Sequence, residues 1–235
     1  MKKLLLVFFL LFTSSTVFQT LAQSGGVNLT LGFPMGEFKE SVSRTGVGIS
    51  GHFMFISPRP QAPFGFGVSV GYINYGSESR REAFSYTIPD VFVDVDRTNN
   101  ILNFHVLFQL MFPRGDVRPY IEGLFGGSYI YTTTSIKSRD YEEVASSTNF
   151  DDFAWSYGGG GGFLIKVHAG GEDGDIGDVF LDLKTRYLLG SEAEYLKEGS
   201  VKFINNKVYY DVSRSKTDLL TAQIGVTAFF NSIWH

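Results

Sequence analysis

Apolar residues alternate with small or polar residues along most of the chain after residue 22, and this is the periodicity of β-strands. The alternation is clearest in residues 102–112, where every even position is apolar and the odd positions are mixed. Residues 220–230 also have one apolar face and one face composed mainly of Thr, Gln and Gly. Similar alternation occurs in residues 27–33, 47–55, 64–72, 121–131, 153–167 and 179–189. The pattern therefore predicts eight strands.

The connections between the predicted strands differ in length in a regular way. Residues 57–63, 113–118 and 168–178 form comparatively short connections, and residues 34–44 form one of intermediate length. The long polar connections are residues 75–100, 132–151 and 190–217. Antiparallel barrels of outer membranes have this asymmetry, with short periplasmic turns and long external loops. An even number of strands then places both termini on the periplasmic side.

Two of the long connections contain further strand-like patches. One patch is residues 91–96, and the other consists of residues 203–204 and 208–210 on either side of Asn205 and Asn206. Paired asparagines are suited to a tight turn. We expect both patches to form hairpins that extend above the membrane.

A soluble barrel with an apolar interior, such as a lipocalin, has the same period. The bulky aromatic face and the Gly- and Ser-rich face argue against it, because an eight-stranded barrel is only just wide enough inside for its side chains. Aromatic residues also gather near the strand ends, as they do at membrane interfaces. We therefore expect an all-β, eight-stranded antiparallel up-and-down transmembrane β-barrel. A soluble periplasmic lipocalin-like ligand carrier is the alternative.

The first 22 residues have the pattern of a secretory signal peptide. Lys2 and Lys3 precede an apolar run over residues 4–12, and Ala22 ends a stretch suited to cleavage. The apolar run is too short to span the hydrocarbon core as a helix. We therefore predict a signal peptide over residues 1–22 and an outer-membrane barrel domain over residues 23–235.

Composition limits the remaining function classes. The chain of 235 residues contains no cysteine, which excludes a disulfide scaffold and a thiolate metal site. A formal net charge of −4 disfavours a basic nucleic-acid binder. The expected partners are outer-membrane lipid, the barrel insertion machinery and an unidentified extracellular partner of the loops, with no nucleic acid and no cofactor.

Three stretches of the chain resemble the outer-membrane β-barrel family that is widespread in Bacteroidota. They are the sequences FPMGEF at 33–38, RPYIEG at 118–123 and LDLKTRYLLG at 181–190, the last followed by Glu194, Tyr195 and Leu196. The resemblance implies a small porin-like barrel in the outer membrane and, for most members, no defined substrate. Members of the family usually end on an aromatic residue that the insertion machinery reads, whereas here either Phe230 or Trp234 has to serve.

Polar and charged residues on the inward face are the candidate functional groups. A charge cluster is predicted in the lower half of the barrel, on strands five to seven, from Glu122, Lys166, Asp182, Lys184 and Arg186. Opposite charges on adjacent strands can pair directly, which favours a salt-bridged plug over a gated ion path. His52, His105, Gln109 and Gln223 are expected to fill the lumen as polar groups. No metal ligand set is predicted, because the two histidines lack further ligands at a suitable spacing.

No enzyme is predicted. A serine–histidine hydrolase acting on membrane lipid would need its histidine on the lipid-facing side, and both candidates are predicted on the other face. The glycine run over residues 158–162 does not match a phosphate loop, because Phe163 replaces the last glycine of G-x-G-x-x-G. Glycines in a strand instead permit close packing. The predicted function is structural or surface interaction through the loops, with a narrow passive pore for small solutes as the alternative.

Overall fold

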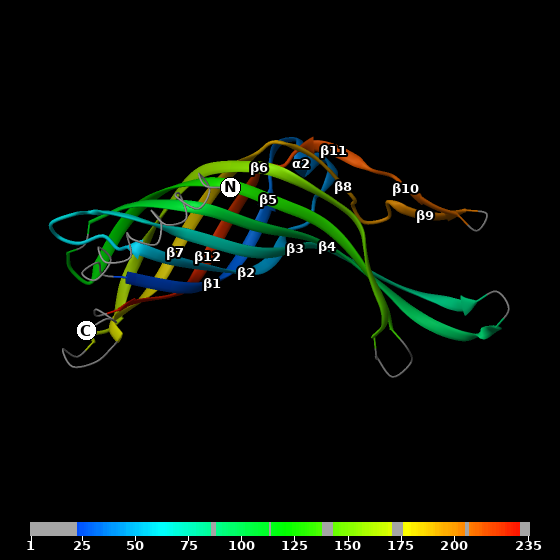
Figure 1. Ribbon diagram of the computed structural model, residues 1–235, viewed down its shortest axis with the longest axis horizontal. Coiled ribbons are helices and arrows are strands. Elements are labelled where there is room, and N and C mark those ends of the chain that lie inside the picture. Colours follow the sequence, from blue (N-terminus) through cyan, green and yellow to red (C-terminus); the bar gives the residue numbers. More distant parts are fainter. Residues whose placement is uncertain are drawn as a thin grey trace, which may run out of the picture.

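Eight long strands close into one barrel in a computed structural model that describes residues 23–85, 88–112, 114–137, 143–170, 176–204 and 207–230. Each strand pairs antiparallel with its neighbour along the chain, and the last strand closes the barrel on the first (Figure 1). The barrel strands are β1 (Gln23–Pro34), β2 (Gly46–Ile56), β3 (Phe64–Ser85), β4 (Ile88–Met111), β5 (Val117–Lys137), β6 (Glu143–His168), β7 (Ile176–Gly190) and β12 (Leu219–Phe230). The prediction of an eight-stranded antiparallel up-and-down barrel is confirmed.

Two predictions fall outside the described residues. The signal peptide over residues 1–22 is one, and the choice of Trp234 as the terminal aromatic residue is the other. Within the described ranges, none of the helices has the length and apolar character needed to cross a membrane.

The two ends of the barrel differ in their connections. Gln23 pairs with Phe230, so the chain enters and leaves the barrel at the same end. The connections β2–β3, β4–β5 and β6–β7 lie at this end, which we call the short-turn end. The opposite end, which we call the loop end, carries the connections β1–β2, β3–β4, β5–β6 and β7–β12.

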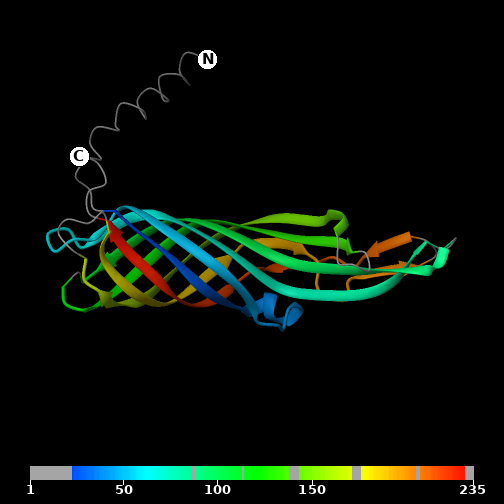
Figure 2. The ribbon, with the colours of Figure 1, turned by 90° about the horizontal axis from the view of Figure 1, so that it is seen from below.

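Four strands continue past the loop end of the barrel as an antiparallel sheet. Pairing of β2 with β3 stops at Val47 and Asn74, and pairing of β6 with β7 starts only at Ser156 and Gly190. Beyond these points β3, β4, β5 and β6 still pair with one another and project far from the barrel (Figure 2). The predicted hairpin around residues 91–96 is therefore present, although the long polar loops expected here are mostly strand.

An ion pair within this projecting sheet illustrates why its strands look polar in sequence. Lys137 Nζ lies 2.7 Å from the Asp96 carboxylate, between neighbouring strands. The hydrogen bond from Lys137 holds the pKa of the Asp96 carboxyl below its ordinary value. Cross-strand ion pairs of this kind support the pairing of strands that lie outside the barrel.

Short elements gather over the loop end. They are α2 (Gly36–Ser41), β8 (Glu192–Tyr195), β9 (Val201–Ile204), β10 (Lys207–Tyr210) and β11 (Ser213–Lys216). Strands β8 and β11 pair with each other, as do β9 and β10. The predicted hairpin in this connection is confirmed by the pairing of Val201 with Tyr210, whereas Asn205 and Asn206 lie outside the described residues.

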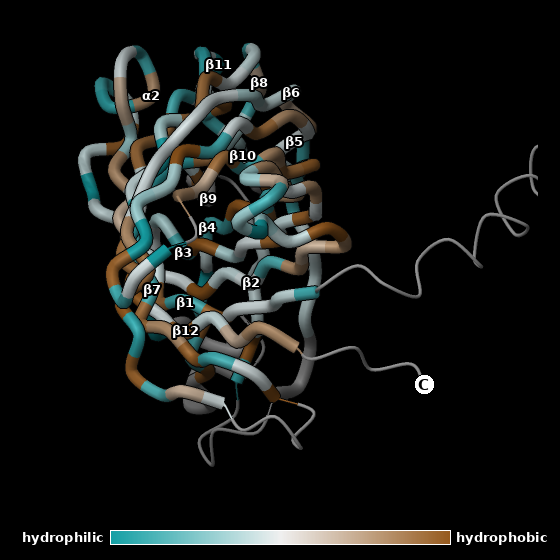
Figure 3. The backbone as a smooth tube through the Cα atoms, turned by 90° about the vertical axis from the view of Figure 1, so that its left-hand side faces the viewer, coloured by the Kyte–Doolittle hydropathy of each residue, from teal (hydrophilic) through white to brown (hydrophobic). Residues whose placement is uncertain are grey.

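Side-chain burial alternates along the barrel strands as predicted. The outward residues Phe108 and Val226 are 55% and 50% exposed, whereas Lys184 and Arg186 are 5% and 4% exposed. The same alternation of hydrophilic and hydrophobic positions can be followed along the backbone in Figure 3. An apolar outer face around a polar interior is the arrangement of membrane barrels and the reverse of a lipocalin-like carrier.

A lysine on the outward face should be far more costly than one in the lumen. We expect Val106→Lys to lower the free energy of unfolding by about 2–4 kcal/mol, because it places a charge among lipid-facing side chains near the bilayer midplane. Gln109→Lys should cost much less, since Gln109 lies on the polar inward face, paired in register with Glu122, where a lysine does not face lipid. Urea unfolding of both variants in lipid vesicles measures the difference; equal costs would contradict the assignment of faces.

Candidate functional site

Two buried ion pairs lie in the lumen of the barrel. In the first, Arg186 on β7 holds Glu122 on β5 with two hydrogen bonds, Nε to Oε1 at 2.5 Å and Nη2 to Oε2 at 3.2 Å. Arg186 also donates through Nη1 to Ser69 Oγ on β3, 2.9 Å away. A two-pronged contact of this kind fixes the orientation of both groups. One arginine therefore joins β7 to both β5 and β3.

The second ion pair forms within a single strand. Lys184 Nζ lies 2.7 Å from Asp182 Oδ2, two residues away on β7. Asp182 also accepts hydrogen bonds from the Tyr120 hydroxyl at 2.6 Å and from Thr227 Oγ1 at 3.3 Å. His52 lies between the same groups, with Nδ1 3.4 Å from Lys184 Nζ and Nε2 3.4 Å from Thr227 Oγ1. Every charge of this pair thus has more than one polar neighbour.

Glycines of β6 make room for both ion pairs. Gly160 is paired in register with Glu122 on one side and Arg186 on the other, and Gly162 is paired with Tyr120 and Lys184. A Cβ on Gly160 would lie 2.9 Å from Arg186 Cγ, and one on Gly162 would lie 2.7 Å from Lys184 Cβ. The glycine run therefore has a steric role. The Glu122–Arg186 pair reaches across this strand, so it is not the direct adjacent-strand pair that was expected.

Lys166 does not join the other charges predicted to cluster with it. Its Nζ lies 2.7 Å from Asp178 Oδ2 near the short-turn end, and Arg118 Nη2 approaches the same oxygen at 3.3 Å. The Arg118 guanidinium also lies 4.4 Å from the centroid of the Phe180 ring. This grouping was not predicted, because Asp178 was expected in a turn and Arg118 at the end of a connection.

The predicted neutral groups line other parts of the lumen. His105 Nε2 lies 3.0 Å from Ser156 Oγ. Gln223 accepts a hydrogen bond from Ser50 Oγ at 3.2 Å, and Gln109 is buried on the same inward face. Among the residues that the structure describes, no group of three or more His, Asp or Glu side chains could hold a metal ion. These residues therefore fill the lumen with hydrogen-bonding groups.

An apolar cluster closes the lumen at the short-turn end. It consists of Met111, Tyr120, Leu164 and Phe180, with Phe229 packed against it. The Phe180 and Phe229 rings meet edge to face with their centroids 5.3 Å apart. Since Tyr120 also binds Asp182, the apolar closure is joined directly to the buried charges.

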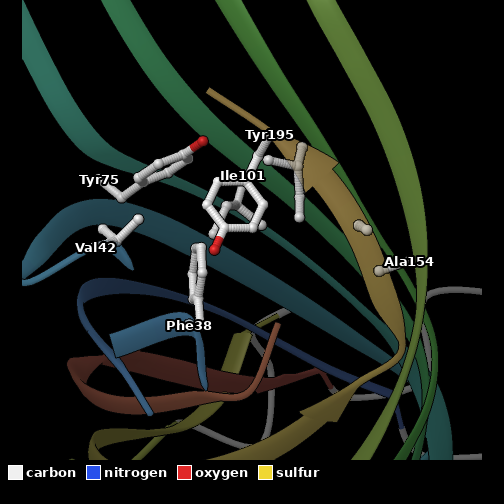
Figure 4. Packing of buried hydrophobic residues seen from close by; sticks show 8 residues of the cluster. Phe38, Val42, Tyr75, Ile101, Ala154 and Tyr195 are labelled. Carbon is white, nitrogen blue, oxygen red and sulfur yellow. The ribbon is translucent and has the colours of Figure 1, made fainter. Parts of the chain in front are cut away.

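A second apolar cluster closes the loop end. Phe38 of α2 is fully buried between two aromatic rings, with centroids 5.8 Å from that of Tyr75 and 5.0 Å from that of Tyr195 (Figure 4). The other members are Val42, Ile101, Ile130, Ala154 and Ala193. We call these eight residues the mouth cluster. The buried charges thus lie between two apolar closures, neither of which was predicted from the sequence.

No family model and no curated protein matches the chain, but it is similar to several solved structures of outer-membrane proteins. Neisserial surface protein A is 11% identical, with 89% of this chain and 95% of that chain covered and a TM-score of 0.40. Ail of Yersinia pestis is 14% identical (89% and 97% covered, TM-score 0.34), and a major outer membrane protein from Thermus thermophilus is 12% identical (89% and 100% covered, TM-score 0.38). At TM-scores below 0.5 these similarities add nothing to the fold, which follows from the strand pairing.

Proposed function

We propose that this protein is an integral outer-membrane β-barrel with a closed lumen, and that its role is structural or lies in surface interaction through the loop end. The apolar outer face supports the location, because such a face is stable only against lipid. The signal-peptide pattern of residues 1–22 supports export, and the resemblance at residues 33–38, 118–123 and 181–190 supports membership of the Bacteroidota barrel family. With the loop end facing outward, both termini and the short-turn end lie in the periplasm.

The observation that carries the proposal is the filling of the lumen. Glu122, Asp182, Lys184 and Arg186 are each at most 6% exposed and balance one another in charge. Apolar clusters cover them toward both ends of the barrel. An ion entering this space would have to displace a hydrogen-bonded charge pair, which is costly in a low-dielectric interior. The arrangement therefore favours a plug over a passive pore.

The burial of polar side chains in the lumen also argues against an enzyme that hydrolyses membrane lipid. The His105–Ser156 pair is the obvious candidate for nucleophile and base, and both side chains are buried in the lumen at 5% and 2% exposure. Membrane lipid contacts the opposite face of the same strands. We propose that the partners of this protein are outer-membrane lipid, the barrel insertion machinery and an extracellular partner of the loop-end elements.

Planar-bilayer conductance tests the plug. We expect the refolded protein to give no steady channels, because apolar clusters cover the buried ion pairs toward both ends of the barrel. Heat-modifiable mobility on an unboiled gel shows that the added protein is a folded barrel. Reproducible channels of one defined conductance from such protein would overturn the proposal in favour of solute transport.

A further inference from the structure

A small polar pocket lies at the loop end, apart from the sealed lumen. Three segments that are distant in sequence form it: residues 41–44 at the end of α2 and just after it, Tyr75 and Asn99 on β3 and β4, and Lys197 and Glu198 after β8. Its volume is about 180 Å³. Sites for drug-sized ligands usually have roughly 300–1,000 Å³, so this pocket is suited to a smaller molecule.

Hydrogen bonds tie the three walls of the pocket together. Glu198 Oε1 accepts from Arg44 Nη1 at 2.5 Å and from the Ser77 backbone N–H at 3.2 Å. The Tyr75 hydroxyl donates to the Leu196 carbonyl at 3.1 Å. These contacts fix the wall around Glu198 against each of the other two before any ligand binds. A preformed site of this kind loses less entropy when it binds.

The pocket has an excess of positive charge and of hydrogen-bond donors. Lys197 is partly buried, and its ammonium group has no carboxylate partner among the residues that the structure describes. Arg44 and Glu198 neutralise each other, so these three side chains leave a net charge of +1. The hydroxyls of Ser41 and Ser43 have no hydrogen-bond partner within the described part of the chain. An ammonium group without a carboxylate partner, beside free hydroxyl donors, favours an anion that can accept several hydrogen bonds.

We propose that this pocket binds a small molecule carrying a carboxylate or phosphate group. Lys197 contributes the main charge, Arg44 contributes the donors that Glu198 does not use, and Ser41 and Ser43 contribute hydroxyls. The inference rests on the proposed function, because the ligand is external only if the loop end faces outward. The binding itself does not depend on the orientation or on the state of the lumen.

Binding is measured by calorimetry on the full barrel refolded in a non-ionic detergent. The probes are glucuronate, inorganic phosphate and, as a neutral sugar matched to glucuronate, glucose. We expect saturable binding of at least one anion, about tenfold or more tighter than that of glucose, since tenfold corresponds to about 1.4 kcal/mol. Binding of glucuronate with none of phosphate identifies an acidic sugar as the class, and the reverse identifies a phosphate group.

Three variants assign the binding to this pocket. Lys197→Ala should weaken anion binding about tenfold, Lys197→Arg should retain it, and both should still migrate as folded barrels. Lys39→Ala is the matched control, because Lys39 is an exposed lysine of the neighbouring helix that does not line the pocket. No saturable anion binding, equal binding of glucose, or equal losses in Lys39→Ala and Lys197→Ala would overturn the proposal. None of these results would affect the conductance test of the closed lumen.

Discussion

Glu122→Leu is expected to lower the free energy of unfolding by about 3–5 kcal/mol, the usual cost of removing one partner from a buried ion pair. Arg186 would keep its charge in the lumen with only Ser69 and more distant groups to compensate it. Urea unfolding in lipid vesicles measures the change. The effect should exceed that of any single substitution at an exposed ion pair of this protein, because exposed pairs contribute roughly 0–1 kcal/mol.

Two controls separate the charge effect from a change of packing. The double variant Glu122→Leu with Arg186→Met should recover most of the lost stability, because replacing a whole buried pair by apolar residues is often neutral or stabilising. Glu192→Leu makes the same change at an ion pair with Arg214 whose side chains are more than half exposed, and it should cost little. A cost below about 1 kcal/mol for Glu122→Leu would contradict the buried pair.

Phe38→Ala is expected to destabilise the mouth cluster by about 3–5 kcal/mol, because it removes a fully buried ring and leaves a cavity. The loss should be local, since the barrel strands keep their own pairing. Hydrogen exchange measures it at the Val42 amide, which donates to the Phe38 carbonyl at 2.8 Å. Protection there should fall by about a hundredfold or more, which corresponds to roughly 3 kcal/mol.

The barrel supplies the reference for this measurement. Amides in the middle of β4, such as that of Phe104, should keep their protection, because local opening of a loop-end element leaves the strand ladder intact. Lys39→Ala changes an exposed residue of the same helix and should leave the Val42 amide protected. Unchanged protection at Val42 in Phe38→Ala would mean that the ring does not hold the cluster together.

The sequence predicted the barrel because lipid imposes an apolar face on every strand that crosses it. In residues 76–82 of β3, where the sheet projects beyond the barrel, small and charged residues occupy both faces, and the alternation that marks a strand is lost. Residues 76–85 therefore looked like a loop although they belong to β3. The helix α2 escaped prediction for a different reason. A six-residue helix is too short to be stable alone, and the burial of Phe38 stabilises it.

Four of the five charged residues predicted for the candidate site lie together, whereas the partner of each was not predicted. Alternation places Glu122, Asp182 and Arg186 inside, but the stagger of the strands decides which charges meet. Gly160 is an example: because it has no side chain, Arg186 on one neighbouring strand can reach Glu122 on the other. The closure at the short-turn end left only a weak signal in the sequence, Met111 on an otherwise mixed face.

The Glu122–Arg186 contact joins strands that are not neighbours, and this limits the order in which the wall can assemble. Between the two apolar closures, a β5–β6 hairpin entering lipid alone would bring the negative charge of Glu122 without a counter-charge, and β7 alone would bring one surplus positive charge. Only the three strands together are electrically neutral in this part of the lumen. We therefore expect insertion of β5, β6 and β7 as one folded unit to cost less free energy than insertion of the β5–β6 hairpin or of β7 alone.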